Sequence, residues 1–260
     1  VLGFGIEAQA LVRQVKLRNP EAVVHIFSEH EVQLEADFPL ADQDCLCIGP
    51  LDAAQLAQFE VLVKSPGISP LHPALMSLDQ SIRITSTTNL WFAERPAERV
   101  IAITGTKGKS TTASLLAHIM RSAGVSVQLV GNIGEPLIAH IDTQADWWVL
   151  ELSSYQTADL RAQPEIGVVL SLFPEHLDWH GGENIYMRDK LRLLSLSRQA
   201  WAPLSLQRVI SELYPKILPQ VQWLQGEQQL RPSKLGVMQG QQLKLAAKKL
   251  ALKGLHNLYN

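Results

Sequence analysis

The sequence has little of what ties a protein together covalently or fixes it in a membrane. Among its 260 residues there are only two cysteines, which excludes a disulfide scaffold. No apolar run approaches the ~18 residues of a membrane-spanning helix, and no signal peptide precedes the first motif. A strong excess of one charge is also missing, because the net charge is −2. We therefore expect a cytoplasmic protein with no nucleic acid or membrane as partner. Any anionic ligand would have to be bound by charged or polar groups close to it, because the chain as a whole has almost no net charge.

The two cysteines, Cys45 and Cys47, lie in an apolar run that is typical of a strand. We expect their sulfurs to point to opposite faces, so that a zinc site would need partners that the neighbourhood does not offer. Both are interpreted as buried free thiols in a reducing cytoplasm.

Both ends of the sequence look cut. The chain opens at Val1 without Met, and only two strand residues precede a glycine turn that normally follows about five or six. It stops at Asn260, directly after a motif-like segment at 254–260. We expect a fragment of a longer enzyme.

The length favours two domains, at ~150 residues per domain. Apolar strands alternate with helical segments through the first part of the chain, which predicts a parallel sheet covered by helices. The pattern changes around 86–97 and restarts with a strand at 99–104. We predict an N-terminal domain over 1–88, a linker with a short helix over 89–98, and a central domain over 99–260. The segment 222–244 has an alternating pattern with glycines and predicts an antiparallel meander.

The strongest motif is the glycine-rich run at 104–112, between a predicted strand and a predicted helix. Glycines allow backbone N–H groups to turn toward phosphate oxygens, and the helix N-terminus favours negative charge. Lys109 can reach the terminal phosphates, and Ser110 can ligate Mg²⁺. The loop is a shortened variant of the standard pattern, with Gly105 as its first glycine. The alternative is an ordinary glycine turn capped by Ser or Thr.

Two predicted strand ends deliver groups that suit a metal ion. Glu151 ends the apolar strand at 147–151, and His176 follows the strand at 167–172. The carboxyl ends of parallel strands meet at one edge of a sheet, where such sheets bind ligands. Lys190 lies in the predicted helix at 185–196 and by itself would be a solvated surface lysine.

Two further turns are weaker signals. The run from Gly3 to Ala8 fits a nucleotide-phosphate turn at a helix N-terminus, but short glycine patterns of this kind are common. The turn at 65–68 would be ordinary in most proteins.

The order of these motifs resembles the Mur ligases, the ATP-dependent amide-forming enzymes of peptidoglycan precursor synthesis, over nearly the whole chain. It is most similar to the branch that adds glutamate to UDP-N-acetylmuramoyl-L-alanine, a step that supports cell-wall biogenesis, cell shape and cell division. The residues that carry the resemblance are Gly3-Phe4-Gly5, Ser65-Pro66-Gly67, 104–112, Gly131-Asn132-Ile133-Gly134, Glu151-Leu152-Ser153-Ser154, His176-Leu177-Asp178, Lys190 and His256-Asn257.

The resemblance implies an α/β fold with an N-terminal Rossmann-like parallel-sheet domain that binds UDP and a central P-loop-type mononucleotide-binding domain. The family's C-terminal Rossmann-like domain would be absent from this chain, which leaves the central domain incomplete at its C-terminal end. We expect a monomer with the small-molecule substrates UDP-N-acetylmuramoyl-L-alanine and glutamate.

The resemblance also implies roles for single residues. Lys109, His176 and Lys190 would be catalytic, with Lys190 carbamylated. One Mg²⁺ ion would bind Ser110 and Glu151, and a second would bind His176 and the carbamylated Lys190. The residues implied to bind ATP are Gly105, Thr106, Lys107, Gly108, Lys109, Ser110, Thr111, Asn257 and Asn260. Those implied to bind the UDP-sugar substrate are Gly3, Gly5, Ser65, Pro66, Gly67, Asn132 and Ser153.

Three residues depart from the usual family pattern: Lys107 for Asn, Tyr155 for Phe, and Trp179 for Arg. The run at 104–109, taken with that at 153–157, looks closer to a divergent branch that adds L-glutamate, whereas the family default is D-glutamate. The enantiomer stays open, because the amino-acid pocket of the family lies largely on the C-terminal domain.

Two other functions remain open at this point. One is another ligase of the same superfamily, such as a folylpolyglutamate synthetase, although the two N-terminal turns suit a UDP-sugar better. The other is a non-catalytic nucleotide-switched binding protein that uses the same phosphate loop and does not need Lys190.

Overall fold

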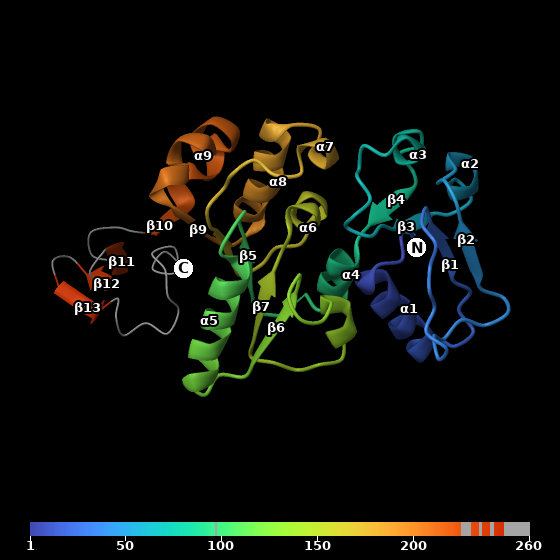
Figure 1. Ribbon diagram of the computed structural model, residues 1–260, viewed down its shortest axis with the longest axis horizontal. Coiled ribbons are helices and arrows are strands. Elements are labelled where there is room, and N and C mark those ends of the chain that lie inside the picture. Colours follow the sequence, from blue (N-terminus) through green and yellow to red (C-terminus); the bar gives the residue numbers. More distant parts are fainter. Residues whose placement is uncertain (97, 225–229, 234–235, 240–241, 247–260) are drawn as a thin grey trace.

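The computed structural model describes residues 1–96, 98–224, 230–233, 236–239 and 242–246. In Figure 1 the N-terminal strands and helices lie at one end, the larger central sheet lies in the middle, and the strands β11 to β13 lie at the other end. Among the described residues, no helix is long and apolar enough to cross a membrane.

The N-terminal part is a parallel sheet, as predicted. Strand β1 (His25–Ser28) pairs in parallel with β2 (Cys45–Ile48), and β3 (Val61–Val63) pairs in parallel with β4 (Arg83–Thr85). Leu2 joins the two pairs, because it forms parallel bridges to both Phe27 and Lys64. Helices α1 (Ile6–Arg18), α2 (Ala53–Leu56) and α3 (Pro73–Met76) connect these strands. The short segment at the start of the chain is therefore the centre of this sheet.

The central sheet has six parallel strands in the order β10-β9-β8-β5-β7-β6. Their bounds are β5 (Val100–Thr104), β6 (Val127–Gly131), β7 (Trp147–Glu151), β8 (Ile166–Val169), β9 (Gln199–Pro203) and β10 (Val221–Leu224). Strand β5 lies between β7 and β8, so its carboxyl end is near the middle of the sheet. Ligands of open parallel sheets bind beyond this edge.

The segment predicted as a meander divides into two parts. Its first residues form β10, which pairs in parallel with β9 and belongs to the central sheet, so this part of the prediction was wrong. The rest is antiparallel as predicted, with β11 (Leu230–Ser233), β12 (Gly236–Gln239) and β13 (Gln242–Ala246). Periodicity alone does not distinguish a short edge strand of one sheet from the first strand of the next.

The helices of the central part carry several of the predicted site residues. They are α4 (Thr87–Glu94), α5 (Lys109–Ser122), α6 (Ser154–Asp159), α7 (Leu177–His180), α8 (Glu183–Leu196) and α9 (Gln207–Leu213), with short 3-10 turns at Leu137–His140, Leu204–Leu206 and Pro215–Gln220. Helix α5 begins directly after the glycine-rich loop, and α8 carries Lys190.

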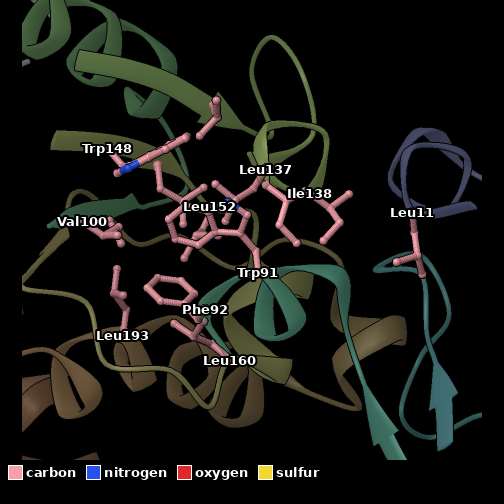
Figure 2. Packing of buried hydrophobic residues seen from close by; sticks show 14 residues of the cluster. Leu11, Trp91, Phe92, Val100, Leu137, Ile138, Trp148, Leu152, Leu160 and Leu193 are labelled. Atoms are coloured by element: carbon pink, nitrogen blue, oxygen red, sulfur yellow. The ribbon is translucent and has the colours of Figure 1, made fainter. Parts of the chain in front are cut away.

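The predicted linker helix, α4, is part of the hydrophobic core. Trp91 is fully buried, and its ring centroid lies 4.8 Å from that of Trp148 on β7. The same cluster includes Phe92 and Leu11, the latter from α1 (Figure 2). Truncation of a buried Trp costs about 3–5 kcal/mol, so this packing fixes α1 and α4 firmly against the central sheet.

The two cysteines lie on the same face of β2, against the prediction. The Sγ atoms of Cys45 and Cys47 are 3.0 Å apart, and both residues are half-buried. Side chains alternate between faces along a strand, so residues two positions apart share a face. The prediction of opposite faces was wrong for this reason.

Candidate functional site

A cavity of about 690 Å³ lies at the carboxyl ends of the N-terminal strands. Six of the seven residues predicted to bind a UDP-sugar line it: Gly3, Gly5, Ser65, Pro66, Gly67 and Asn132. The seventh, Ser153, does not line it; its hydroxyl accepts from the Gln156 backbone N–H and caps α6. Turns that are far apart in the sequence therefore meet around one space.

The turn at Gly3 requires glycine. Its φ is 75°, and a Cβ at this position would lie 3.0 Å from the Cβ and Oγ of Ser65. The left-handed backbone and this close approach bring the first glycine turn against the turn at 65–67. The cavity is formed where these two turns face each other.

The central part of the chain supplies the other wall of this cavity. Asn132 follows β6, and Trp179 lies on α7. From the N-terminal part, Glu29 and His72 also line the cavity, with Glu29 Oε1 3.2 Å from His72 Nε2. The sequence analysis did not assign Trp179, Glu29 or His72 to the site. Only the position of Glu29, directly after β1, was a signal that could have found it.

The phosphate loop lies between β5 and α5, as predicted. Gly105 has a φ of 156° and Gly108 has a φ of 86°, both in the range that favours glycine. A Cβ on Gly105 would lie 2.8 Å from the Cβ of Leu170. The loop backbone therefore passes close to the end of β8, and Gly108 directs the chain into the first turn of α5.

Thr106 holds this loop in place. Its hydroxyl lies 2.7 Å from the Tyr186 hydroxyl, donates to the Phe173 carbonyl oxygen at 3.0 Å and accepts from the Phe173 N–H at 2.8 Å. Its own backbone N–H donates to the Ser171 carbonyl oxygen at 2.7 Å. These bonds occupy its polar groups within the protein, and a nucleotide contact of Thr106 stays a prediction.

Four other loop residues are exposed or half-buried. The Lys109 ammonium donates to the Thr106 carbonyl oxygen at 3.1 Å. Lys107 is exposed and forms an ion pair with Glu175 at 2.6 Å, which lowers the pKa of Glu175. Ser110 is exposed at the start of α5, and Thr111, next to it, is half-buried. Asn257 and Asn260, predicted to face adenine, lie outside the described residues.

Lys190 is buried beneath the phosphate loop, against the expectation for a lone surface lysine. Its side chain is 2% exposed, and its ammonium donates to the Gly105 carbonyl oxygen at 2.9 Å. Burial, together with the charge of Lys109, lowers the pKa of Lys190 to about 7. This lysine therefore exists partly as the neutral amine near neutral pH.

Glu151 ends β7 beside the loop and is 1% exposed. Its Oε1 accepts from the Asn132 side-chain amide at 3.1 Å, whereas its Oε2 has no hydrogen-bond partner among the described residues. A buried carboxylate oxygen without a partner is costly unless a cation or a donor completes the site. Because Asn132 lines the cavity, this hydrogen bond also connects the cavity with the edge of the sheet that carries the phosphate loop.

His176 lies just before α7 with a φ of 54°, which is rare for a residue other than glycine. It is exposed, and its ring centroid lies 5.2 Å from that of Tyr155. The described residues contain no group of three or more His, Cys, Asp or Glu side chains that could hold a metal ion. Of the predicted metal ligands, Lys190 contacts the loop that leads to Ser110. That Glu151 and His176 bind metal ions beside this loop stays a prediction.

The fold and these sites define a class of protein: an α/β protein with a glycine-rich loop of the phosphate-binding type and a separate cavity. Residues 103–216 match the family model of the Mur ligase middle domain. The chain therefore carries a Mur ligase middle domain, and the resemblance seen in the motifs is confirmed.

The chain is similar to curated ligases over most of its length. It is 45% identical to a UDP-N-acetylmuramoyl-L-alanine--L-glutamate ligase of Xanthomonas euvesicatoria over 75% of this chain and 44% of the relative. It is 37% identical to a ligase of the same name from Xylella fastidiosa strain Temecula1 over 98% of this chain and 57% of the relative. The chain thus spans about half the length of the curated relatives it matches.

A solved structure has the same fold. The UDP-N-acetylmuramate:L-alanyl-gamma-D-glutamyl-meso-diaminopimelate ligase from Neisseria meningitides aligns with 99% of this chain and 88% of its own, at 18% identity and a TM-score of 0.57. The two parallel sheets of this chain are therefore those of a Mur ligase fold.

Proposed function

We propose that the protein is an ATP-dependent amide ligase that joins glutamate to UDP-N-acetylmuramoyl-L-alanine through an acyl phosphate. The observation that carries this proposal is the position of Asn132, which lines the N-terminal cavity and donates to Glu151 beside the phosphate loop. A ligase that activates a carboxylate with ATP needs its two substrate sites in contact, because the carboxylate must reach the γ-phosphate. The relatives that match over most of the chain carry the name of such a ligase.

The N-terminal domain, residues 1–88, would hold the uridine diphosphate part of the substrate. The cavity volume of about 690 Å³ is in the range of small-molecule sites, ~300–1,000 Å³. Gly3, Gly5 and the turn at 65–67 would allow the backbone to approach the diphosphate. Asn132 and Ser153 would meet the muramoyl part, where the substrate leaves the N-terminal domain.

The central domain, residues 99–260, would hold ATP on the loop at 105–111, with Asn257 and Asn260 toward adenine. The substrate carboxylate and the γ-phosphate repel each other, so the Lys109 ammonium must neutralise the charge that builds up during transfer. Transfer of the γ-phosphoryl group to the carboxylate gives the acyl phosphate and ADP. The amino group of glutamate then attacks the acyl carbon, and the amide forms with release of phosphate and one proton.

The residues at the loop fit Mg²⁺, because Glu151 has a buried carboxylate oxygen without a partner and Ser110 has an exposed hydroxyl. Mg²⁺ keeps few protein ligands and takes phosphate oxygens for the rest, so Ser110 and Glu151 suffice for one ion. His176 and a modified Lys190 would hold a second. When bound, such ions supply positive charge to the phosphate oxygens.

Carbamylation of Lys190 would follow from its burial. The ammonium first loses one proton. The neutral amine then attacks carbon dioxide, an N–C bond forms and a second proton is released, so the cation becomes an anion. With a pKa of about 7, Lys190 offers the neutral amine near neutral pH, where an exposed lysine is almost wholly protonated. The product carbamate would remove a positive charge from the neighbourhood of Lys109 and supply a metal ligand.

L-glutamate is the amino acid that the relatives favour, because both are named for it. The D-enantiomer is the alternative, as in the default of the family. We further propose that the enzyme is a monomer and acts in the cytoplasm on soluble substrates.

The deciding experiment uses the protein at its native length. It is incubated with ATP, Mg²⁺, UDP-N-acetylmuramoyl-L-alanine and either enantiomer of glutamate, and phosphate release is measured. We expect release with L-glutamate and not with D-glutamate. No release with either enantiomer would reject the ligase proposal, and release with the D-enantiomer alone would reject the L-specific branch.

One binding measurement and one activity measurement separate the other functions. Calorimetry with UDP should show binding, whereas a folylpolyglutamate synthetase would show none. Lys190→Ala should lose ligase activity, and added chloride should restore part of it by supplying an anion. Full activity of this variant without added anion would reject the carbamate role.

A further inference from the structure

Trp179 connects the two parts of the chain at the cavity wall. Its indole N–H donates to the Gly67 carbonyl oxygen at 2.9 Å, and its own carbonyl oxygen accepts from the Ser69 hydroxyl at 2.7 Å. Both partners lie in the loop after β3, and Gly67 belongs to the turn predicted to meet the diphosphate. One residue of α7 is thus bonded through its backbone and its side chain to the loop that lines the cavity.

The next turn of the chain strengthens this contact. Gly181 has a φ of 82°, and a Cβ at this position would lie 2.7 Å from the Cδ1 of Leu71. Helix α7 therefore packs closely at both Trp179 and Gly181 against the loop at 65–71.

Helix α7 begins at the predicted metal ligand His176. Its left-handed backbone, with a φ of 54°, makes the position of His176 sensitive to how α7 is held. The ring of Tyr155 contacts both Trp179 and His176, because its centroid is 4.4 Å from that of Trp179 and 5.2 Å from that of His176. Trp179 and His176 are therefore linked both through helix α7 and through the ring of Tyr155.

We propose that Trp179 is a positioning residue that couples occupancy of the N-terminal cavity to nucleotide binding at the phosphate loop. A ligand that contacts Gly67 fixes the carbonyl oxygen to which the indole donates, and the indole fixes α7 and His176. This inference rests on the proposed function, because it takes the UDP-sugar and the Mg²⁺-nucleotide as the two ligands. The role assigned to Trp179 depends on its indole N–H, which packing of the ring alone would not require.

The test compares Trp179→Phe with the native protein. Phenylalanine keeps an aromatic ring beside Tyr155 but leaves the Gly67 carbonyl oxygen without its donor. Calorimetry gives the Kd of the β,γ-methylene analogue of ATP with Mg²⁺, in the absence and in the presence of saturating UDP-N-acetylmuramoyl-L-alanine. The ratio of the two Kd values is the coupling, which is typically ~5–150-fold in coupled systems.

We expect a coupling of about tenfold in the native protein. In Trp179→Phe we expect the coupling to fall to about twofold or less, with the Kd of the nucleotide alone changed by about twofold at most. Ser69→Ala, which removes the other hydrogen bond to Trp179, should reduce the coupling in the same direction. Trp147→Phe is the matched control, because Trp147 begins β7 and stacks on Arg99 at the opposite edge of the sheet, and it should keep the native coupling.

Coupling that persists in Trp179→Phe at its native value would overturn the inference, as would its absence from the native protein. Either result counts against the inference only if the native protein binds both the nucleotide analogue and UDP-N-acetylmuramoyl-L-alanine. A native protein that binds neither ligand would overturn the proposed function and this inference with it. Thermal unfolding of each variant shows whether a lost coupling reflects a lost fold, and Ser69→Ala decides the outcome if Trp179→Phe does not fold.

Discussion

The ammonium of Lys190 lies 2.9 Å from the carbonyl oxygen of Gly105, so a buried lysine supports the first glycine of the phosphate loop from below. In the described part of the chain no carboxylate pairs with this ammonium within 4 Å, and burial lowers its pKa to about 7. Burial beneath the loop and the charge of Lys109 therefore keep Lys190 ready to lose its proton, although its ammonium also donates to the loop.

Lys190→Met should stabilise the fold in buffer free of carbon dioxide. Above pH 7 the folded protein leaves Lys190 neutral, whereas the unfolded chain keeps the proton up to the ordinary value of 10.5. The unfolded state thus binds more protons between these values, and the free energy of unfolding of the native protein rises with pH through this window. The variant lacks that rise and should be more stable by on the order of 2–4 kcal/mol at pH 7, with a smaller gain at pH 9. Urea unfolding at the two pH values measures both differences.

Lys64→Met is the contrasting control. Lys64 is also buried, but its ammonium lies 2.7 Å from Oδ2 of Asp159. Its removal leaves a largely buried carboxylate without its cation, which costs about 3–5 kcal/mol. The two buried lysines should therefore give changes of opposite sign, and equal destabilisation by both substitutions would contradict the role assigned to the burial of Lys190.

The sequence predicted what depends on local spacing. The glycine-rich loop lies between a strand and a helix as predicted, because the strand end, the glycines and the start of the helix are adjacent in the sequence. The meeting of Gly3 with the turn at 65–67 was also predictable in outline, because parallel strands end at one edge of a sheet.

The rest depends on contacts between distant segments. Nothing in the sequence around Trp179 indicates that its indole bonds to Gly67, because that contact spans 112 positions and two sheets. The burial of Lys190 had a partial signal, because Tyr186 and Leu194 lie four residues to either side of it on the buried face of α8. The loop that packs over this face was not visible from that pattern. For Cys45 and Cys47 the sequence pattern was sufficient to predict a shared face of the strand. The prediction failed because residues two positions apart were placed on opposite faces.

Glu151→Gln should raise stability in the absence of metal and remove the response to Mg²⁺. The native carboxylate has one buried oxygen without a partner, and leaving such a group unsatisfied costs about 1–3 kcal/mol or more. The amide removes the buried negative charge, which is the larger part of this cost, and its oxygen can still accept from Asn132. Thermal unfolding with EDTA, and then with Mg²⁺ and the methylene analogue of ATP, measures both effects. The native protein should gain stability from the Mg²⁺-nucleotide and the variant should gain little, so an equal gain in both would exclude Glu151 as a metal ligand.

The cysteine pair should react as one unit with a trivalent arsenical. The two sulfurs lie 3.0 Å apart on the same face of β2, an edge strand of its sheet. Phenylarsine oxide forms two As–S bonds to a dithiol and releases water, so one equivalent should consume both thiols. Intact mass and thiol titration measure the product. Cys47→Ser, with one thiol left, should retain no stable adduct, and two freely titratable thiols in the treated native protein would contradict the shared face.

Gly131→Ala should destabilise the fold more than the same change at another left-handed glycine. Gly131 ends β6 with a φ of 107°, and a Cβ there would lie 2.3 Å from the backbone carbonyl oxygen of Glu151. Because that atom belongs to a buried strand, the added methyl forces the backbone apart, which costs about 1–3 kcal/mol beyond the ~1–2 kcal/mol of left-handed strain.

Gly124 has a φ of 82° with nothing within 4 Å of its Cβ position among the described residues, so Gly124→Ala carries the strain alone. Urea unfolding of both variants isolates the contact at Glu151, and a displaced Glu151 should also weaken Mg²⁺-nucleotide binding in Gly131→Ala but not in Gly124→Ala. Equal unfolding free energies for the two variants would show that the β6 end can move away from β7 at little cost.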